Sequence, residues 1–175
     1  NRFKLDPSYK WVHLLIGTNT LEMSKYTLSG HDFCGVGVEL TPDKWNISAM
    51  YGRLNKAVEY DPLVANYQTV AFKRMGYAAK VGYAGDFGGE YNVSFFHGED
   101  DETSLSRIPD ESYLSPKKNT AISVMVSQKF LKYFFVRAEY AFSVYNSNLF
   151  NEENEPVQTK SFIDKIFKKN PSERY

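Results

Sequence analysis

The chain has 175 residues, 42% of them hydrophobic and 16% aromatic, with 21 acidic and 21 basic side chains. This is enough apolar material for one ordinary domain, while a formal net charge of zero gives no reason to expect nucleic acid as a partner. Cys34 is the only cysteine, which excludes an internal disulfide, and no apolar run is long enough for a membrane helix.

Alternation of apolar and polar side chains with a period of two is the strongest local signal, and it predicts an all-β chain. The expected strands cover residues 10–16, 21–28, 33–40, 45–52, 73–84, 89–97, 120–129 and 132–145. The second of these alternates poorly. We therefore expect about eight strands in residues 1–146.

The connections between these strands fall into two groups. Short turns are expected at residues 17–20, 41–44 and 85–88 and near 130–131. The remaining connections are a tight turn at 29–32 and long polar loops at 55–70 and 99–118. Because successive connections in an up-and-down barrel alternate between its ends, this order predicts short turns at one end and loops at the other. Outer-membrane barrels have this asymmetry.

The pattern changes after residue 146, so residues 147–175 are expected to form a polar loop with a short amphipathic helix. Phe162, Ile163, Ile166 and Phe167 would form one apolar stripe, and Pro171 would follow the helix end. The stripe predicts packing on a loop or a partner; a stray amphipathic turn is the alternative.

The composition of the polar face favours a membrane barrel over a soluble one. That face is rich in Gly, Ala and Ser, as expected for a crowded, wet lumen, whereas a soluble barrel would present many long polar side chains to water. Isolated charges on this face are the lumen-lining candidates, and we expect them to pair across the interior rather than to form an anion-selective lining. They are Glu39, Arg74, Lys80, Glu90, Arg137 and Glu139.

Aromatic residues near strand ends support the same interpretation. Trp45 and Tyr51 lie at the two ends of one expected strand, and Tyr77 and Tyr83 lie on another. Amphipathic rings at these positions suit the two membrane interfaces. Packing inside a soluble core is the alternative.

Two segments carry a resemblance to a known group of proteins. They are residues 26–61 (YTLSGHDFCGVGVELTPDKWNISAMYGRLNKAVEYD) and residues 71–83 (AFKRMGYAAKVGY), about half of the chain. Both are similar to large, mostly uncharacterised outer-membrane β-barrel proteins of Bacteroidota, most specifically in S-G-H, G-V-G-V-E-L-T-P, A-M-Y-G-R-L and F-K-R-M-G-Y. The resemblance implies a location in the bacterial outer membrane, surrounded by its lipid, and a longer chain. It implies no reaction.

The sequence offers little support for catalysis. Ser29, His31 and Asp32 are close in sequence, but residues of one tight turn cannot orient a hydrolytic triad. His13 and His97 have no obvious partners and are interpreted as structural. No enzyme activity, cofactor or metal is therefore predicted.

One acidic run leaves a cation site open. Glu99, Asp100, Asp101 and Glu102 begin the second long loop, where they supply carboxylates without the spacing of an EF-hand. A solvated acidic surface is the preferred interpretation, and a calcium site is the alternative.

The combined expectation is an antiparallel up-and-down transmembrane β-barrel, or part of a larger one with further strands outside this sequence. It would act without catalysis, as a porin-like transport channel or as a membrane subunit of a cell-envelope assembly with other envelope proteins or lipoproteins. The alternatives are a secreted, lipocalin-like barrel that binds an apolar ligand, and a membrane-embedded hydrolase using Ser29 and His31.

Overall fold

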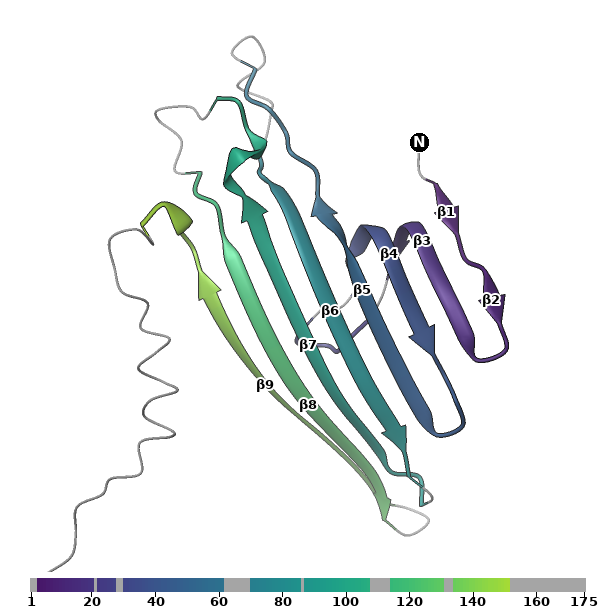
Figure 1. The fold of residues 1–175 in the computed structure, drawn as a ribbon. Helices are drawn as coiled ribbons and strands as arrows, with labels where there is room; N and C mark the ends of the chain where they lie inside the picture. The colour runs from purple at the N-terminus through teal and green to yellow at the C-terminus, as the bar shows by residue number, and fades with distance from the viewer. Residues whose placement is uncertain are drawn as a thin grey trace, which may run out of the picture.

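The computed structural model describes residues 3–20, 22–27, 30–61, 70–85, 87–107, 114–130 and 134–151. These residues form one antiparallel meander sheet with the strand order β1-β3-β4-β5-β6-β7-β8-β9, and β2 also pairs with β3 (Figure 1). The sheet is not closed into a barrel, because the two ends of this order do not pair. The expected all-β, up-and-down topology is confirmed. The short helix expected to carry Phe162, Ile163, Ile166 and Phe167 lies outside the described residues.

The strands lengthen from the N-terminus toward the C-terminus. Their bounds are β1 Lys4–Leu5, β2 Ser8–Tyr9, β3 Val12–Thr20, β4 Asp32–Leu40, β5 Trp45–Asn55, β6 Lys73–Ala84, β7 Glu90–Asp101, β8 Lys118–Phe130 and β9 Phe134–Asn146. Two short 3₁₀ helices, η1 (Glu102–Ser104) and η2 (Leu149–Asn151), follow β7 and β9. No helix in this part of the chain is long and apolar enough to cross a membrane.

The N-terminal part of the strand prediction is wrong. Residues 17–20 are not a turn but the second half of β3, which pairs with β4 from Val12 to Thr20 without interruption. Gly17 resembles a turn signal, yet it is needed for another reason: a Cβ atom there would overlap the carbonyl oxygen of Phe3, which accepts a hydrogen bond from the Thr18 amide. The described part of the expected strand at 21–28 is not a strand of the sheet.

With residues 17–20 assigned to β3, short and long connections alternate regularly along the chain. The β2–β3, β4–β5, β6–β7 and β8–β9 connections are short and lie at one end of the sheet, drawn at the bottom of Figure 1. The connections made from the other ends of the strands are longer and cover residues 21–31, 56–72 and 102–117. Of the expected tight turn at 29–32, Ser29 lies outside the described residues, Gly30 and His31 belong to the first of these connections, and Asp32 begins β4. The predicted asymmetry is therefore present, although one of its members was assigned incorrectly.

Short turns fix the register of the hairpins they join. In the β4–β5 turn, Pro42 accepts a hydrogen bond from the Trp45 amide and Asp43 has a positive φ of 52°. In the β6–β7 turn, the Gly85 amide donates to the Gly89 carbonyl, and Gly88 has a φ of 73°, a conformation that glycine adopts without strain.

A row of glycines in register crosses the sheet from β3 to β7. Successive pairs in register are Gly17–Gly35, Gly35–Gly52, Gly52–Gly76 and Gly76–Gly98. A Cβ atom at Gly35 would lie 2.5 Å from the Cα of Gly52, so no larger residue fits there without a shift. A register shift between Arg53 and Asn55 marks a bulge, and Leu54 at this bulge packs over Gly76.

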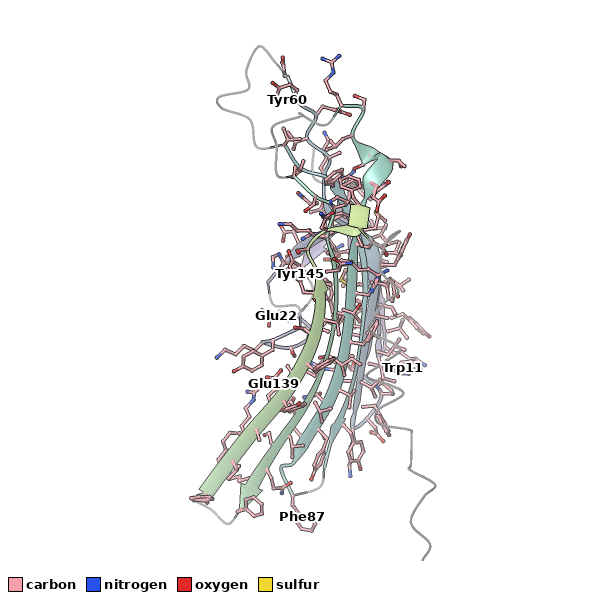
Figure 2. All side chains as sticks on the ribbon, turned by 90° about the vertical axis from the view of Figure 1, so that its left-hand side faces the viewer. Trp11, Glu22, Tyr60, Phe87, Glu139 and Tyr145 are labelled. Carbon is pink, nitrogen blue, oxygen red and sulfur yellow. The ribbon has the colours of Figure 1, made fainter. Side chains whose placement is uncertain are left out.

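The connection between β3 and β4 does not extend away from the sheet. Residues 22–27, here called the strap, lie on the side of the sheet that carries the glycine row. Met23 of the strap is buried in a cluster with Phe33, Met50 and Phe96. Figure 2 shows Glu22 of the strap on the same side of the sheet as Glu139, with Trp11 on the other side.

Candidate functional site

The two faces of the sheet have different chemistry, and the less polar one is the more exposed. We call the face that bears Val93, Val124 and Tyr140 the apolar face, and the face that bears Ser94, Ser123 and Glu139 the polar face. Ser94 and Ser123 are each 2% exposed, whereas Val124 is 43% exposed. This is the reverse of the burial expected in a soluble sheet.

The apolar face is continuous from β3 to β9. Side chains that are paired in register on successive strands form three rows across this face. The rows are Val12–Leu40–Ile47–Val81–Val93–Val124–Tyr140, Leu14–Val38–Ala49–Ala79–Phe95–Ile122–Phe142, and Ile16–Val36–Tyr51–Tyr77–His97–Thr120–Val144. Val136, Tyr140 and Phe142 of β9 are 42%, 75% and 47% exposed, so these side chains point away from any core of the described chain.

Aromatic rings gather at both margins of this face. Tyr51 and Tyr77 are paired in register near the loop end, and Trp45 and Tyr83 are paired near the turn end, with ring centroids 5.0 Å apart. On β5, Trp45 and Tyr51 are six positions apart, as are Tyr77 and Tyr83 on β6. This spacing corresponds to about 20 Å along the strand. The register thus joins the aromatic residues singled out in the sequence into two margins around a mainly aliphatic band, which also contains Phe95, Phe142 and Tyr140.

Polar groups appear on the same face at and beyond the Tyr51–Tyr77 margin. His97 Nδ1 lies 2.8 Å from Thr120 Oγ1, and Lys118 Nζ lies 3.5 Å from Glu99 Oε1. Tyr77 stacks against His97 with ring centroids 4.9 Å apart. The apolar band therefore gives way to polar and then charged side chains toward the loop end.

A closed ring of four hydroxyl groups fastens the strap to the polar face. Ser24 Oγ lies 2.9 Å from Ser123 Oγ, which lies 2.7 Å from Ser94 Oγ. Thr27 Oγ1 lies 3.1 Å from Ser94 Oγ and donates to Ser24 Oγ over 2.9 Å. Ser24 Oγ accepts from both Ser123 Oγ and Thr27 Oγ1, and the buried Ser94 and Ser123 each have hydroxyl partners within hydrogen-bond distance.

The six predicted lumen-lining charges all belong to the polar face, as the register of their strands requires. In the part of the chain that the structure describes, however, no ion pair joins any two of them. Arg74 instead pairs with Asp100 through Nε–Oδ1 at 2.7 Å and Nη2–Oδ2 at 2.9 Å. Glu90 accepts from Asn92 Nδ2 over 2.8 Å, and Arg137 donates to the Met125 sulfur over 3.1 Å.

The acidic run is not the beginning of a loop, because Glu99, Asp100 and Asp101 are the last residues of β7. Their alternation separates them: Glu99 faces Lys118, Asp100 faces Arg74, and Asp101 accepts from the Thr103 amide and hydroxyl. The hydrogen bonds from Thr103 lower the pKa of Asp101. Among the described residues, no group of three or more His, Cys, Asp or Glu side chains is placed to hold a metal ion.

A recess of ≈ 350 Å³ lies where the strap faces β9. Lys25 and Tyr26 line it from the strap, and Arg137 and Glu139 line it from β9. Glu139 Oε1 is buried without a hydrogen-bond partner in the described chain. The recess thus brings together two cations and one carboxylate, none of which is paired with an opposite charge in that part of the protein.

Sequence analysis did not find the strap or the recess. The strap residues alternate too poorly to distinguish a strand from a connection, and hydroxyl contacts between residues 99 positions apart, such as Ser24 and Ser123, leave no local signal. Of the other residues considered for chemistry, His31 is exposed, and Ser29 lies outside the described residues.

No protein-family model, curated protein or solved structure matches the chain.

Proposed function

We propose that this sheet is part of the wall of a bacterial outer-membrane β-barrel that acts without catalysis. The apolar face would contact lipid, and the polar face would line a hydrated interior. The observation that carries this proposal is the exposed apolar face from β3 to β9, which no other described segment covers, opposite a polar face whose serines are buried. Lipid-facing and lumen-facing side chains alternate in this way along the strands of membrane barrels.

The size of the uncovered surface argues against a soluble sheet. Soluble monomers rarely expose a contiguous apolar patch larger than a few hundred Å². Exposed members of this face include Val36, Tyr51, Val81, Val93 and Ile122, on five successive strands. In a lipocalin-like barrel these side chains would fill the interior, but the strap lies against the opposite face.

Unpaired charges on the polar face favour a water-filled interior over a sealed scaffold. Lys80 is half-buried, Arg137 is exposed, and neither forms an ion pair within the described chain. An unpaired charge is costly to remove from water. We infer that water solvates these groups, and that the barrel serves as a passage for hydrophilic solutes. A sealed membrane subunit of an envelope assembly would need partners for these charges.

The free edge of β9 supports continuation of the wall. This strand has 13 residues without proline, and its second edge pairs with no strand of the described chain. Long unprotected edges favour pairing with another strand. A wall extended at β9 would satisfy this edge and continue both faces.

Arginine substitution at two depths tests the proposal. Val124 lies in the middle of the apolar band, and Val144 lies in the row of Tyr51 and Tyr77; their exposed fractions are 43% and 46%. In lipid, Val124→Arg should lower the free energy of unfolding by roughly 2–4 kcal/mol and Val144→Arg by about 0–1 kcal/mol. The measurement is urea unfolding of the full-length protein in vesicles.

The matched exposure of the two valines makes the comparison informative. If the apolar face is in water, both arginines lie at solvent-exposed strand positions and should have similar small effects. Equal effects, or extraction of the wild-type protein from membranes without detergent, would contradict the membrane proposal.

A further inference from the structure

We propose that the strap narrows the interior of the barrel and leaves one passage beside β9, where small anionic solutes pass more readily than cations. This inference rests on the membrane proposal above. It adds a role for the strap, which is to narrow the interior, and a class of solute, which is small anions.

The placement of the strap is unusual for the connection it makes. It joins β3 to the adjacent β4, a distance that a short turn could span, yet its hydroxyls contact β7 and β8. The connection therefore passes across the polar face of the strands between them. In a closed barrel, a segment in this position occupies the lumen.

Two kinds of contact hold the strap in place. Met23 is 2% exposed and packs into the cluster of Phe33, Met50 and Phe96. Ser24 and Thr27 complete the hydroxyl ring with Ser94 and Ser123. An apolar anchor next to a closed set of hydrogen bonds specifies one position for this segment.

The opening that remains is the recess between the strap and β9. Lys25 and Arg137 supply two positive charges there, and Glu139 supplies one negative charge. Tyr26 completes the lining. A constriction with a net positive lining attracts anions and repels cations, and the narrowest point of a pore dominates its selectivity.

The position of the strap is tested by a disulfide in the full-length protein carrying Cys34→Ser. Because Ser24 Oγ and Ser123 Oγ are 2.9 Å apart, Ser24→Cys with Ser123→Cys should form a disulfide on mild oxidation. Ser24→Cys with Ser127→Cys is the control, since Ser127 lies four positions, about 13 Å, farther along β8 than Ser123.

The narrowing is tested by single-channel recording in planar bilayers. Ser24→Ala with Thr27→Val removes both strap hydroxyls, and we expect the conductance to rise about twofold or more as the strap leaves its position. Ser115→Ala with Thr120→Val removes two hydroxyls outside the ring and should leave the conductance unchanged. The engineered disulfide between positions 24 and 123 should keep the conductance at or below the wild-type value.

Selectivity is read from the reversal potential in a potassium chloride gradient. The wild-type protein should favour chloride. Lys25→Glu changes the recess from two cations and one carboxylate to one cation and two carboxylates, so the sign of the reversal potential should invert. Lys10→Glu, at the β2–β3 turn and outside the recess, is the matched control and should leave that sign unchanged.

The outcomes separate this proposal from the one on which it rests. If the protein is embedded in the membrane but the disulfide does not form, or neither strap variant changes conductance or selectivity, the strap proposal is overturned and the membrane wall stands. If the protein conducts nothing in any form while embedded, the constriction is also excluded. Failure to embed in the membrane overturns both.

Discussion

At the scale of single residues, the best-defined polar contact is the pair of hydrogen bonds between Arg74 and Asp100. The side chain of Asp100 is only 6% exposed, and its Oδ2 also accepts from the Lys117 amide. Bonding to Asp100 raises the pKa of Arg74, which stays charged throughout the physiological range. The pair therefore joins β6, β7 and the start of the β8 segment beyond the aromatic margin.

Replacing Asp100 should be costly. Asp100→Asn removes the charge that holds Arg74 and should lower the free energy of unfolding by about 1–3 kcal/mol, a range that allows for the 39% exposure of the arginine. Glu102→Gln, at an exposed site two positions away, should stay within about 0.5 kcal/mol. Urea titration in vesicles measures both. Equal stability of the two variants would show that the pair contributes nothing.

For the charged residues, the sequence predicted the face of the sheet on which each lies but not the residue with which each pairs. Alternation alone placed Arg74, Lys80 and Arg137 on one face, which the register confirms. It did not identify Asp100 as the partner of Arg74, because Asp100 was assigned to a loop. The boundary of β7 was placed four residues too early, and acidic residues at a strand end resemble the beginning of a loop.

At the scale of elements, the glycine row marks positions where neighbouring backbone leaves no room for a Cβ atom, as at Gly17, Gly35 and Gly52. A Cβ atom at Gly35 would overlap the carbonyl oxygen of Tyr51, which is backbone and cannot rotate away. Gly35→Ala should therefore lower the free energy of unfolding by roughly 1–3 kcal/mol, as overpacking of a dense region does.

Gly85→Ala is the control for the glycine row. A Cβ atom at Gly85 meets nothing closer than 3.5 Å, so this variant should unfold at nearly the wild-type urea concentration. Should Gly35→Ala match Gly85→Ala in the same titration, close strand approach at the row would not be a stability requirement.

The glycine row shows why the strands were easier to predict from the sequence than the contacts between them. Turn residues such as Pro42 and Asp43 mark the β4–β5 hairpin, and a short turn sets the register of its strands. The β5–β6 and β7–β8 connections are long and set no register from sequence. The alignment of Gly52 with Gly76 therefore became visible only in the structure. The same reasoning applies to the strap, which contacts strands distant in sequence.

At the scale of the whole molecule, the order of the strands could be predicted from the sequence, but closure of the sheet could not. The period of two and the alternating loop lengths predicted an antiparallel meander, and the structure has it. Closure was beyond the sequence, because it depends on whether the edges of the sheet meet, and here β1 and β9 do not. Membrane embedding remains a proposal supported by the uncovered apolar face.

The most direct test of the membrane wall is the environment of successive side chains along β8. Single nitroxide labels at residues 120–127, in a Cys34→Ser background of the full-length protein in vesicles, report collisions with oxygen and with a water-soluble nickel complex. Labels at 122, 124 and 126 should collide mainly with oxygen, which concentrates in lipid, and labels at 121, 123 and 125 should collide weakly with it. Strong nickel collisions at 122, 124 and 126, or no alternation, would show that the apolar face does not contact lipid.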